Sequence, residues 1–277
     1  MKYIFKNTLI VTLCLSFIAT LYSCSSEKKS SESDATEEVS VEDVNEFIEK
    51  EFKYPIPTSF EVTQLLQDAG ASFLSDITNS PDNVDKYETQ RAKALNLGIY
   101  GADLSYASTF DKQEETMKYL EVSKGLVDGL QLSNVFTQEM ADQIEANIES
   151  KDTLITIISK TFYETYSQLN KNGQDKLALL VVSGSWIEGL YITAKLAVVS
   201  EYDKRLMDIV GNQKLSAQKL KELCETYQDD EDVKSILPLI RFMNLIYDGV
   251  IEGAGITEGQ LNDIIDNVEA TRNDIIG

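Results

Sequence analysis

The sequence contains no histidine, and only three of its 277 residues are cysteines. Without histidine the chain can form no Ser-His-Asp or Cys-His catalytic arrangement and no histidine-rich zinc site. Cys14 and Cys24 lie in the N-terminal segment, so Cys224 alone cannot build a cysteine zinc site or an internal disulfide in the rest of the chain. Any metal would have to be a hard cation held by oxygen ligands. We predict neither a metal site nor a cofactor.

Basic residues are also scarce, because 25 Lys and Arg oppose 46 Asp and Glu, for a formal net charge of −21. They are scattered and form no basic stripe. Such a charge repels nucleic acid and anionic lipid, so we do not expect the protein to bind nucleic acid. Cys224 belongs to a helical apolar stripe with Leu220, Leu223 and Tyr227, which predicts a packing role for its thiol.

The N-terminus has the organisation of an export signal. Lys2 and Lys6 precede the apolar run 8–21, which is shorter than the roughly 20 apolar residues that span a bilayer. Residues 21–24, Leu-Tyr-Ser-Cys, resemble the lipobox of bacterial lipoproteins, although Tyr22 stands where a small residue is usual. The resemblance implies that Cys24 receives a diacylglycerol thioether and that the preceding residues are removed. The alternatives are an ordinary secretory signal and an uncleaved anchor.

This resemblance divides the chain into three parts. Residues 1–23 are the signal peptide, and residues 24–52 are a lipidated cysteine with a flexible acidic, serine-rich tether, too poor in apolar residues to fold. Residues 53–277 form the globular domain. Ser25 replaces the aspartate that retains many lipoproteins in the inner membrane. We therefore expect a cell-envelope protein, anchored to the outer membrane through Cys24, with its membrane face and oligomeric state left open.

Useful apolar and polar alternation is absent, so the domain is predicted to be all-α. Start signals occur at Ser80-Pro81, Asp111, Thr137, Ser216 and the Thr257 to Gln260 capping box, and Asn172-Gly173 is a stop signal. Short connections predict a compact antiparallel multi-helix bundle of about nine or ten helices. The expected helices are 59–77, 81–109, 112–131, 137–149, 152–171, 174–201, 203–211, 216–228, 232–252 and 257–274.

The segment 177–199 is the most apolar of the mature chain, but its glycines and charges favour a central core helix over a membrane span. Glu188 and Lys195 share one face of it, which we interpret as the wet edge of that helix, with a pocket-lining row as the alternative. Glycine in a helix costs roughly 1 kcal/mol against alanine. Close helix approach is the favoured reason for Gly98, Gly101, Gly184 and Gly189, and room for a ligand is the second.

Residues 98–104 and 184–190 share a glycine, aromatic and acidic composition. This similarity leaves open whether the bundle consists of two similar helical halves. The two segments also supply a candidate ligand-binding set of aromatic and acidic side chains: Tyr100, Asp103, Tyr106, Trp186, Glu188 and Tyr191.

Two further stretches, 54–62 and 97–107, resemble segments of an uncharacterised family of all-helical bacterial envelope lipoproteins. The resemblance implies an envelope location and carries over no activity and no functional residues.

The leading functional hypothesis is a non-enzymatic, lipid-anchored protein that binds a partner protein or another envelope component. The alternative is a small-molecule-binding module with a pocket between long helices. A carboxylate-based glycan hydrolase is less favoured, because the motifs of the helical transglycosylases are missing. No catalytic residue is assigned.

The lipobox makes a direct chemical prediction. Intact-mass spectrometry of the protein from its native host should show a chain that begins at Cys24 and carries a diacylglycerol adduct. A Cys24→Ser variant should lack the adduct and leave the membrane fraction. An intact leader with an unmodified Cys24 would contradict the anchor.

Overall fold

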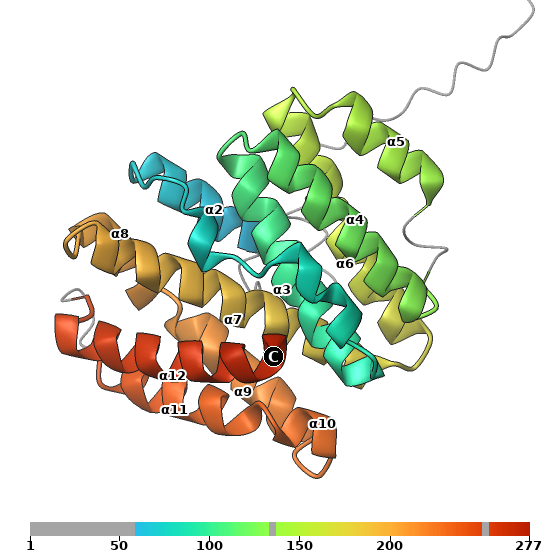
Figure 1. The fold of residues 1–277 in the computed structure, drawn as a ribbon. Helices are drawn as coiled ribbons and strands as arrows, with labels where there is room; N and C mark the ends of the chain where they lie inside the picture. The colour runs from blue at the N-terminus through green and yellow to red at the C-terminus, as the bar shows by residue number, and fades with distance from the viewer. Residues whose placement is uncertain (1–58, 133–136, 251–254) are drawn as a thin grey trace, which may run out of the picture. The chain divides into compact units, whose positions relative to one another are not determined.

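The fold is described from a computed structural model, for residues 59–132, 137–250 and 255–277. Within these ranges every regular element is a helix and there is no strand. The predicted all-α multi-helix bundle is therefore confirmed (Figure 1). The signal peptide 1–23, Cys24 and the tether 24–52 lie outside the described residues, as does the first of two compact units, Met1–Glu38.

The described residues form eleven α-helices and two short 3₁₀ helices. In chain order they are α2 (Ser59–Asp68), η1 (Ser75–Ile77), η2 (Pro81–Lys86), α3 (Gln90–Thr109), α4 (Gln113–Gly129), α5 (Gln138–Ala146), α6 (Lys151–Lys171), α7 (Asp175–Val199), α8 (Lys204–Gly211), α9 (Lys214–Thr226), α10 (Glu231–Lys234), α11 (Leu237–Asp248) and α12 (Glu258–Ile276).

The helix α7 lies at the centre of the bundle. It packs against α3 and α6 on one side and against α12 and α9 on the other (Figure 1). By length and composition alone α7 could cross a membrane, but 94% of its most apolar window is buried inside the protein. This burial explains why its sequence has no continuous polar face, and it confirms the prediction of a central core helix.

The contact between α3 and α7 is the most extensive among the described helices, and it is built on two glycines. A Cβ atom on Gly98 would lie 2.0 Å from the carbonyl oxygen of Val181, and one on Gly184 would lie 2.0 Å from that of Leu95. The two contacts are symmetric: Gly98 lies on Val181, three residues before Gly184, and Gly184 lies on Leu95, three residues before Gly98. The close-approach interpretation is confirmed at Gly98 and Gly184, because no side chain fits between these backbones. It is wrong for Gly101, where a Cβ would lie 3.7 Å from the Phe162 side chain, at ordinary contact distance.

Two predicted helices are interrupted near the N-terminal end. The helix expected over 59–77 ends at Asp68, and Gly70 follows with φ of +82°, in the left-handed region that ends helices. The helix expected over 81–109 is a 3₁₀ helix that begins at Pro81, followed by the separate helix α3. Thr89 begins α3, because its hydroxyl accepts a hydrogen bond from the backbone N–H of Ala92 at 3.0 Å.

The helix expected over 232–252 is also divided. α10 ends at Lys234, and Pro238 lies in the first turn of α11, where its missing N–H costs no helical hydrogen bond. Among the predicted starts, the Thr257 to Gln260 capping box forms completely and Thr137 caps α5.

Two start signals are wrong. Asp111 has φ of +55° and lies before α4, whose start has no side-chain cap, and Ser216 lies inside α9. Aspartate tolerates the left-handed conformation, so Asp111 forms part of the turn between α3 and α4 instead of capping a helix. At the stop signal, Gly173 takes a positive φ of +70° directly after α6 and its C-cap Asn172, as predicted.

The glycine contact gives a stability prediction with an internal control. Gly184→Ala should lower the free energy of unfolding by about 3 kcal/mol, because the new methyl group meets backbone that cannot rotate away. Gly125→Ala, in an exposed and open position of α4, should raise it by up to about 1 kcal/mol. Urea denaturation of both variants measures the difference. Equal effects of the two substitutions would contradict the close approach.

Candidate functional site

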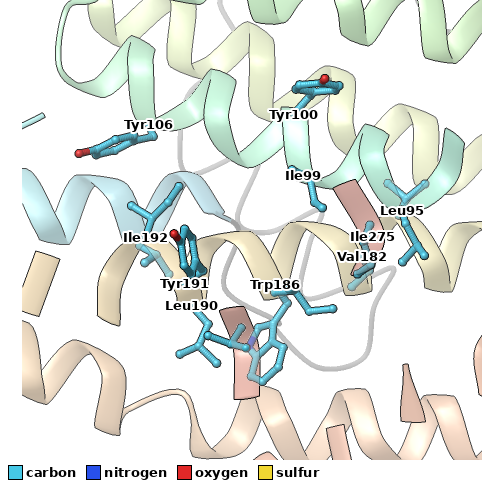
Figure 2. Packing of buried hydrophobic residues seen from close by; sticks show 14 of the residues in the cluster. Leu95, Ile99, Tyr100, Tyr106, Val182, Trp186, Leu190, Tyr191, Ile192 and Ile275 are labelled. Atoms are coloured by element: carbon cyan, nitrogen blue, oxygen red, sulfur yellow. The ribbon is translucent and has the colours of Figure 1, made fainter. Parts of the chain in front are cut away.

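The six predicted ligand-binding side chains are all buried in the core. Tyr100, Asp103 and Tyr106 lie on α3, and Trp186, Glu188 and Tyr191 lie on α7. Figure 2 shows that the aromatic members of the set do not converge, because Trp186 extends from the side of α7 opposite to α3 and Tyr100 lies on the far side of α3.

Asp103 and Glu188 are brought together, and a third residue joins them. Arg272 of α12 donates two hydrogen bonds to the Glu188 carboxylate, from Nε to Oε2 at 2.5 Å and from Nη2 to Oε1 at 2.8 Å. Its Nη2 also donates to the carbonyl of Ile77 at 3.1 Å. All three charged side chains are buried. We call Asp103, Glu188 and Arg272 the buried charge cluster.

The buried charge cluster holds two carboxyls for one guanidinium. Burial, and then the negative charge of Glu188, raise the pKa of Asp103 well above its ordinary value, against a smaller opposing effect of Arg272. Burial would lower the pKa of Arg272, but the charge of Glu188 and its hydrogen bonds to the guanidinium raise it above its ordinary value. Asp103 therefore keeps its proton in the presence of the Glu188 carboxylate. The cluster is an ion pair with a neutral acid beside it.

Further polar contacts join the segment before α3 to the end of α12. Asp103 Oδ2 accepts from the backbone N–H of Asn79 at 3.1 Å, and Asn79 Nδ2 donates to Tyr87 Oη at 3.0 Å. Tyr87 in turn donates to the carbonyl of Ile276, and Asn96 Nδ2 donates to that of Ile275 at 3.1 Å. These bonds satisfy carbonyls at the end of α12 that the helix leaves free.

The wet-edge interpretation is wrong for Glu188, which is fully buried. Both members of the row face α12: Glu188 pairs with Arg272, and the half-buried Lys195 pairs with Glu269 at 2.9 Å. The guanidinium of Arg272 also lies 4.4 Å from the centre of the Tyr191 ring. The row is the interface between α7 and α12, where a buried carboxylate needs a charged partner.

A small cavity borders one of the predicted residues. It measures about 10 Å³ and is lined by Trp186, Gly189 and Gln213 among others. The indole Nε1–H of Trp186 is buried and has no partner within the described part of the chain. This volume is close to the minimum for one water molecule. The cavity beside Trp186 thus has room for one solvent molecule and no larger ligand.

A larger cavity lies elsewhere, between α3, α4 and α6. It measures about 50 Å³, is partly open to solvent, and is lined by apolar and hydroxyl side chains and one glycine: Leu97, Gly101, Leu104, Ser105, Leu120, Ser123, Val127, Ile144, Ile158, Ser159, Thr161, Phe162, Thr165 and Val181. We call it the α4–α6 cavity. The hydroxyls of Ser123 and Ser159 are buried there and have no hydrogen-bond partner among the described residues.

Sequence reasoning missed Arg272, Ser123 and Ser159, although each stands at a core position of a helical apolar stripe. Arg272 follows Leu261, Ile264, Ile265 and Val268 in the register that faces the core. A polar residue in such a register is the available signal, because it needs a partner when buried.

Among the described residues, no group of three or more Cys, Asp and Glu side chains is placed to hold a metal ion. Comparisons of the chain with known proteins found no matching family model, no matching curated protein and no matching solved structure. The resemblance of 54–62 and 97–107 to helical envelope lipoproteins stays a prediction.

The buried charge cluster predicts opposite effects for two isosteric substitutions. Glu188→Gln should lower the free energy of unfolding by about 3 to 5 kcal/mol, because it leaves Arg272 buried without its counter-charge. Asp103→Asn should be tolerated, because the amide replaces a protonated carboxyl and its oxygen still accepts from Asn79.

The pH dependence of stability gives a second test of Asp103. A raised pKa in the folded state means that the native protein binds the proton more tightly, so Asp103 costs stability as the pH rises from its ordinary value of 3.8 through the raised one. The stability of Asp103→Asn relative to wild type should therefore grow with pH over this range. Urea denaturation from pH 4 upward measures it. Parallel profiles would contradict a protonated Asp103.

Proposed function

We propose that the protein is a lipid-anchored, non-enzymatic envelope protein whose helical domain binds a small molecule in the α4–α6 cavity. The proposal follows the alternative hypothesis of a small-molecule-binding module and moves its site from the Tyr100 and Trp186 region to the other side of α3. The anchor in this proposal rests on the lipobox at Cys24, and the outer-membrane location on Ser25.

The observation that carries the proposal is the α4–α6 cavity itself. Its walls combine apolar side chains with hydroxyls, which is the composition typical of small-molecule sites. Protein interiors are close-packed, so a cavity of about 50 Å³ with two unpaired hydroxyls needs a reason. An engineered cavity of roughly 150 Å³ binds benzene. The occupant is therefore a small group, or the end of a longer molecule that extends through the open side.

The other two hypotheses receive less support. A glycan hydrolase needs two carboxyls that face a substrate, whereas Asp103 and Glu188 are buried, with Glu188 paired to Arg272. A docking surface for a partner protein would favour a contiguous apolar patch. The large hydrophobic side chains exposed among the described residues are distributed over four helices: Leu65, Val199, Leu215, Leu223 and Leu245.

A cavity-filling variant tests the proposal. Gly101 lines the cavity, and a Cβ there would lie 3.7 Å from the Phe162 ring, at ordinary contact distance. Gly101→Val should fill the site, while Gly125→Val adds the same group to an open helical position on α4. Protein purified from host envelopes without denaturation should carry a non-covalent small molecule in native mass spectrometry. Gly101→Val should lose it and Gly125→Val should keep it.

Two results would contradict this proposal. One is wild-type protein that carries no small molecule. The other is the same molecule on wild type and on Gly101→Val in equal amounts. Specific capture of one protein from crosslinked envelopes would instead support the partner-protein hypothesis.

A further inference from the structure

Ser123 and Ser159 differ from most other buried serine and threonine hydroxyls of the bundle, and they share this lack of a partner with Thr116 on α4, which does not line the cavity. Six buried serine and threonine side chains donate to the carbonyl four residues earlier in their own helix: Ser105, Ser108, Thr161, Thr165, Ser183 and Thr193. This back-bonding is the ordinary way in which a helix satisfies a buried hydroxyl. Ser123 and Ser159 make no such bond, although they are only 6% and 7% exposed.

The two hydroxyls border the same cavity from different helices. Ser123 lies on α4 and Ser159 on α6, and both helices pack against α3. Among the described residues that line the cavity there is no charged side chain. An unpaired buried hydroxyl costs free energy of the order of one lost hydrogen bond. A ligand that supplies the missing partner recovers that free energy, and only a ligand with a polar atom can do so.

Resting on the proposed function, we infer that the α4–α6 cavity recognises an uncharged aliphatic group that carries a hydroxyl or carbonyl oxygen, held by Ser123 and Ser159. Serine hydroxyls both donate and accept, so they match either oxygen. A carboxylate is disfavoured, because the lining offers no cation to offset its desolvation. A purely apolar group fits the walls but leaves both hydroxyls unpaired.

The test compares three probes on one protein: 1-butanol, butyrate and xenon. Butanol carries the inferred oxygen, butyrate has the same chain length with a charge, and xenon reports apolar space alone. The full chain is placed in bilayer nanodiscs with labelled methyl groups. The methyl signals of Val127, Ile144 and Ile158, which line the cavity, are followed during each titration.

Butanol should shift these methyl signals saturably. Ser123→Ala and Ser159→Ala should each weaken its binding by about threefold to tenfold, the effect of one neutral hydrogen bond. Ser105→Ala is the matched control, because Ser105 lines the same cavity with its hydroxyl already bonded to the carbonyl of Gly101. It should change the affinity by less than about twofold, which is below the effect of a lost bond. Butyrate should bind at least about tenfold more weakly than butanol.

Xenon separates this inference from the proposed function. If xenon shifts the cavity methyl signals but butanol binds the Ser123→Ala/Ser159→Ala double variant as tightly as wild type, the cavity binds ligands and the oxygen recognition is wrong. If neither xenon nor butanol shifts these signals, both the proposed small-molecule site and this inference are contradicted. Binding of butyrate as tight as that of butanol also overturns the inference.

Discussion

The contact of backbone on backbone between α3 and α7 is the constraint on which the rest of the domain depends. Gly98 and Gly184 allow it, because any side chain at either position would overlap a carbonyl group of the other helix. The contact fixes two long helices at one crossing point and carries both of the central acidic residues. Asp103 follows Gly98 by five positions and Glu188 follows Gly184 by four, so a single crossing brings both carboxyls into one buried region.

The proximity of the Asp103 and Glu188 carboxyls determines how α12 packs. Two acids in a core can remain only if one keeps a proton and the other finds a cation, and Arg272 of α12 is that cation. The same guanidinium binds the carbonyl of Ile77, so one side chain joins α7, α12 and the segment before α3. Replacing a buried ion pair by apolar residues often costs little stability, whereas removing one partner costs much. The pair therefore acts mainly to select the position of α12.

The helical class and most helix ends follow from local chemistry and could be predicted from the sequence. Thr137, Thr257 and Gly173 act through the residues within one turn of them, so their effect is visible without the fold. The environment of Glu188 depends on Arg272, 84 positions away, and the wet-edge interpretation failed for that reason. A helix as uniformly apolar as α7 offers no wet edge, and an acid on it needs a partner from another helix. The α4–α6 cavity depends on the spacing between helices, which no local pattern encodes.

The α4–α6 cavity itself follows from the crossing. Leu97 and Val181 line it and flank the contact at Gly98, whose Cβ position meets the Val181 carbonyl. One turn further along α3, Gly101 contributes no side chain toward Phe162, so the space there is left unfilled. The wall formed by α3 and α7 thus belongs to the most tightly held part of the core, and filling the cavity requires no movement of α3 relative to α7. In the proposed function, this site would be formed before its ligand arrives, and a preformed site avoids much of the ordering cost of binding. The proposed small neutral group could then be retained by few contacts, and the two hydroxyls would select it.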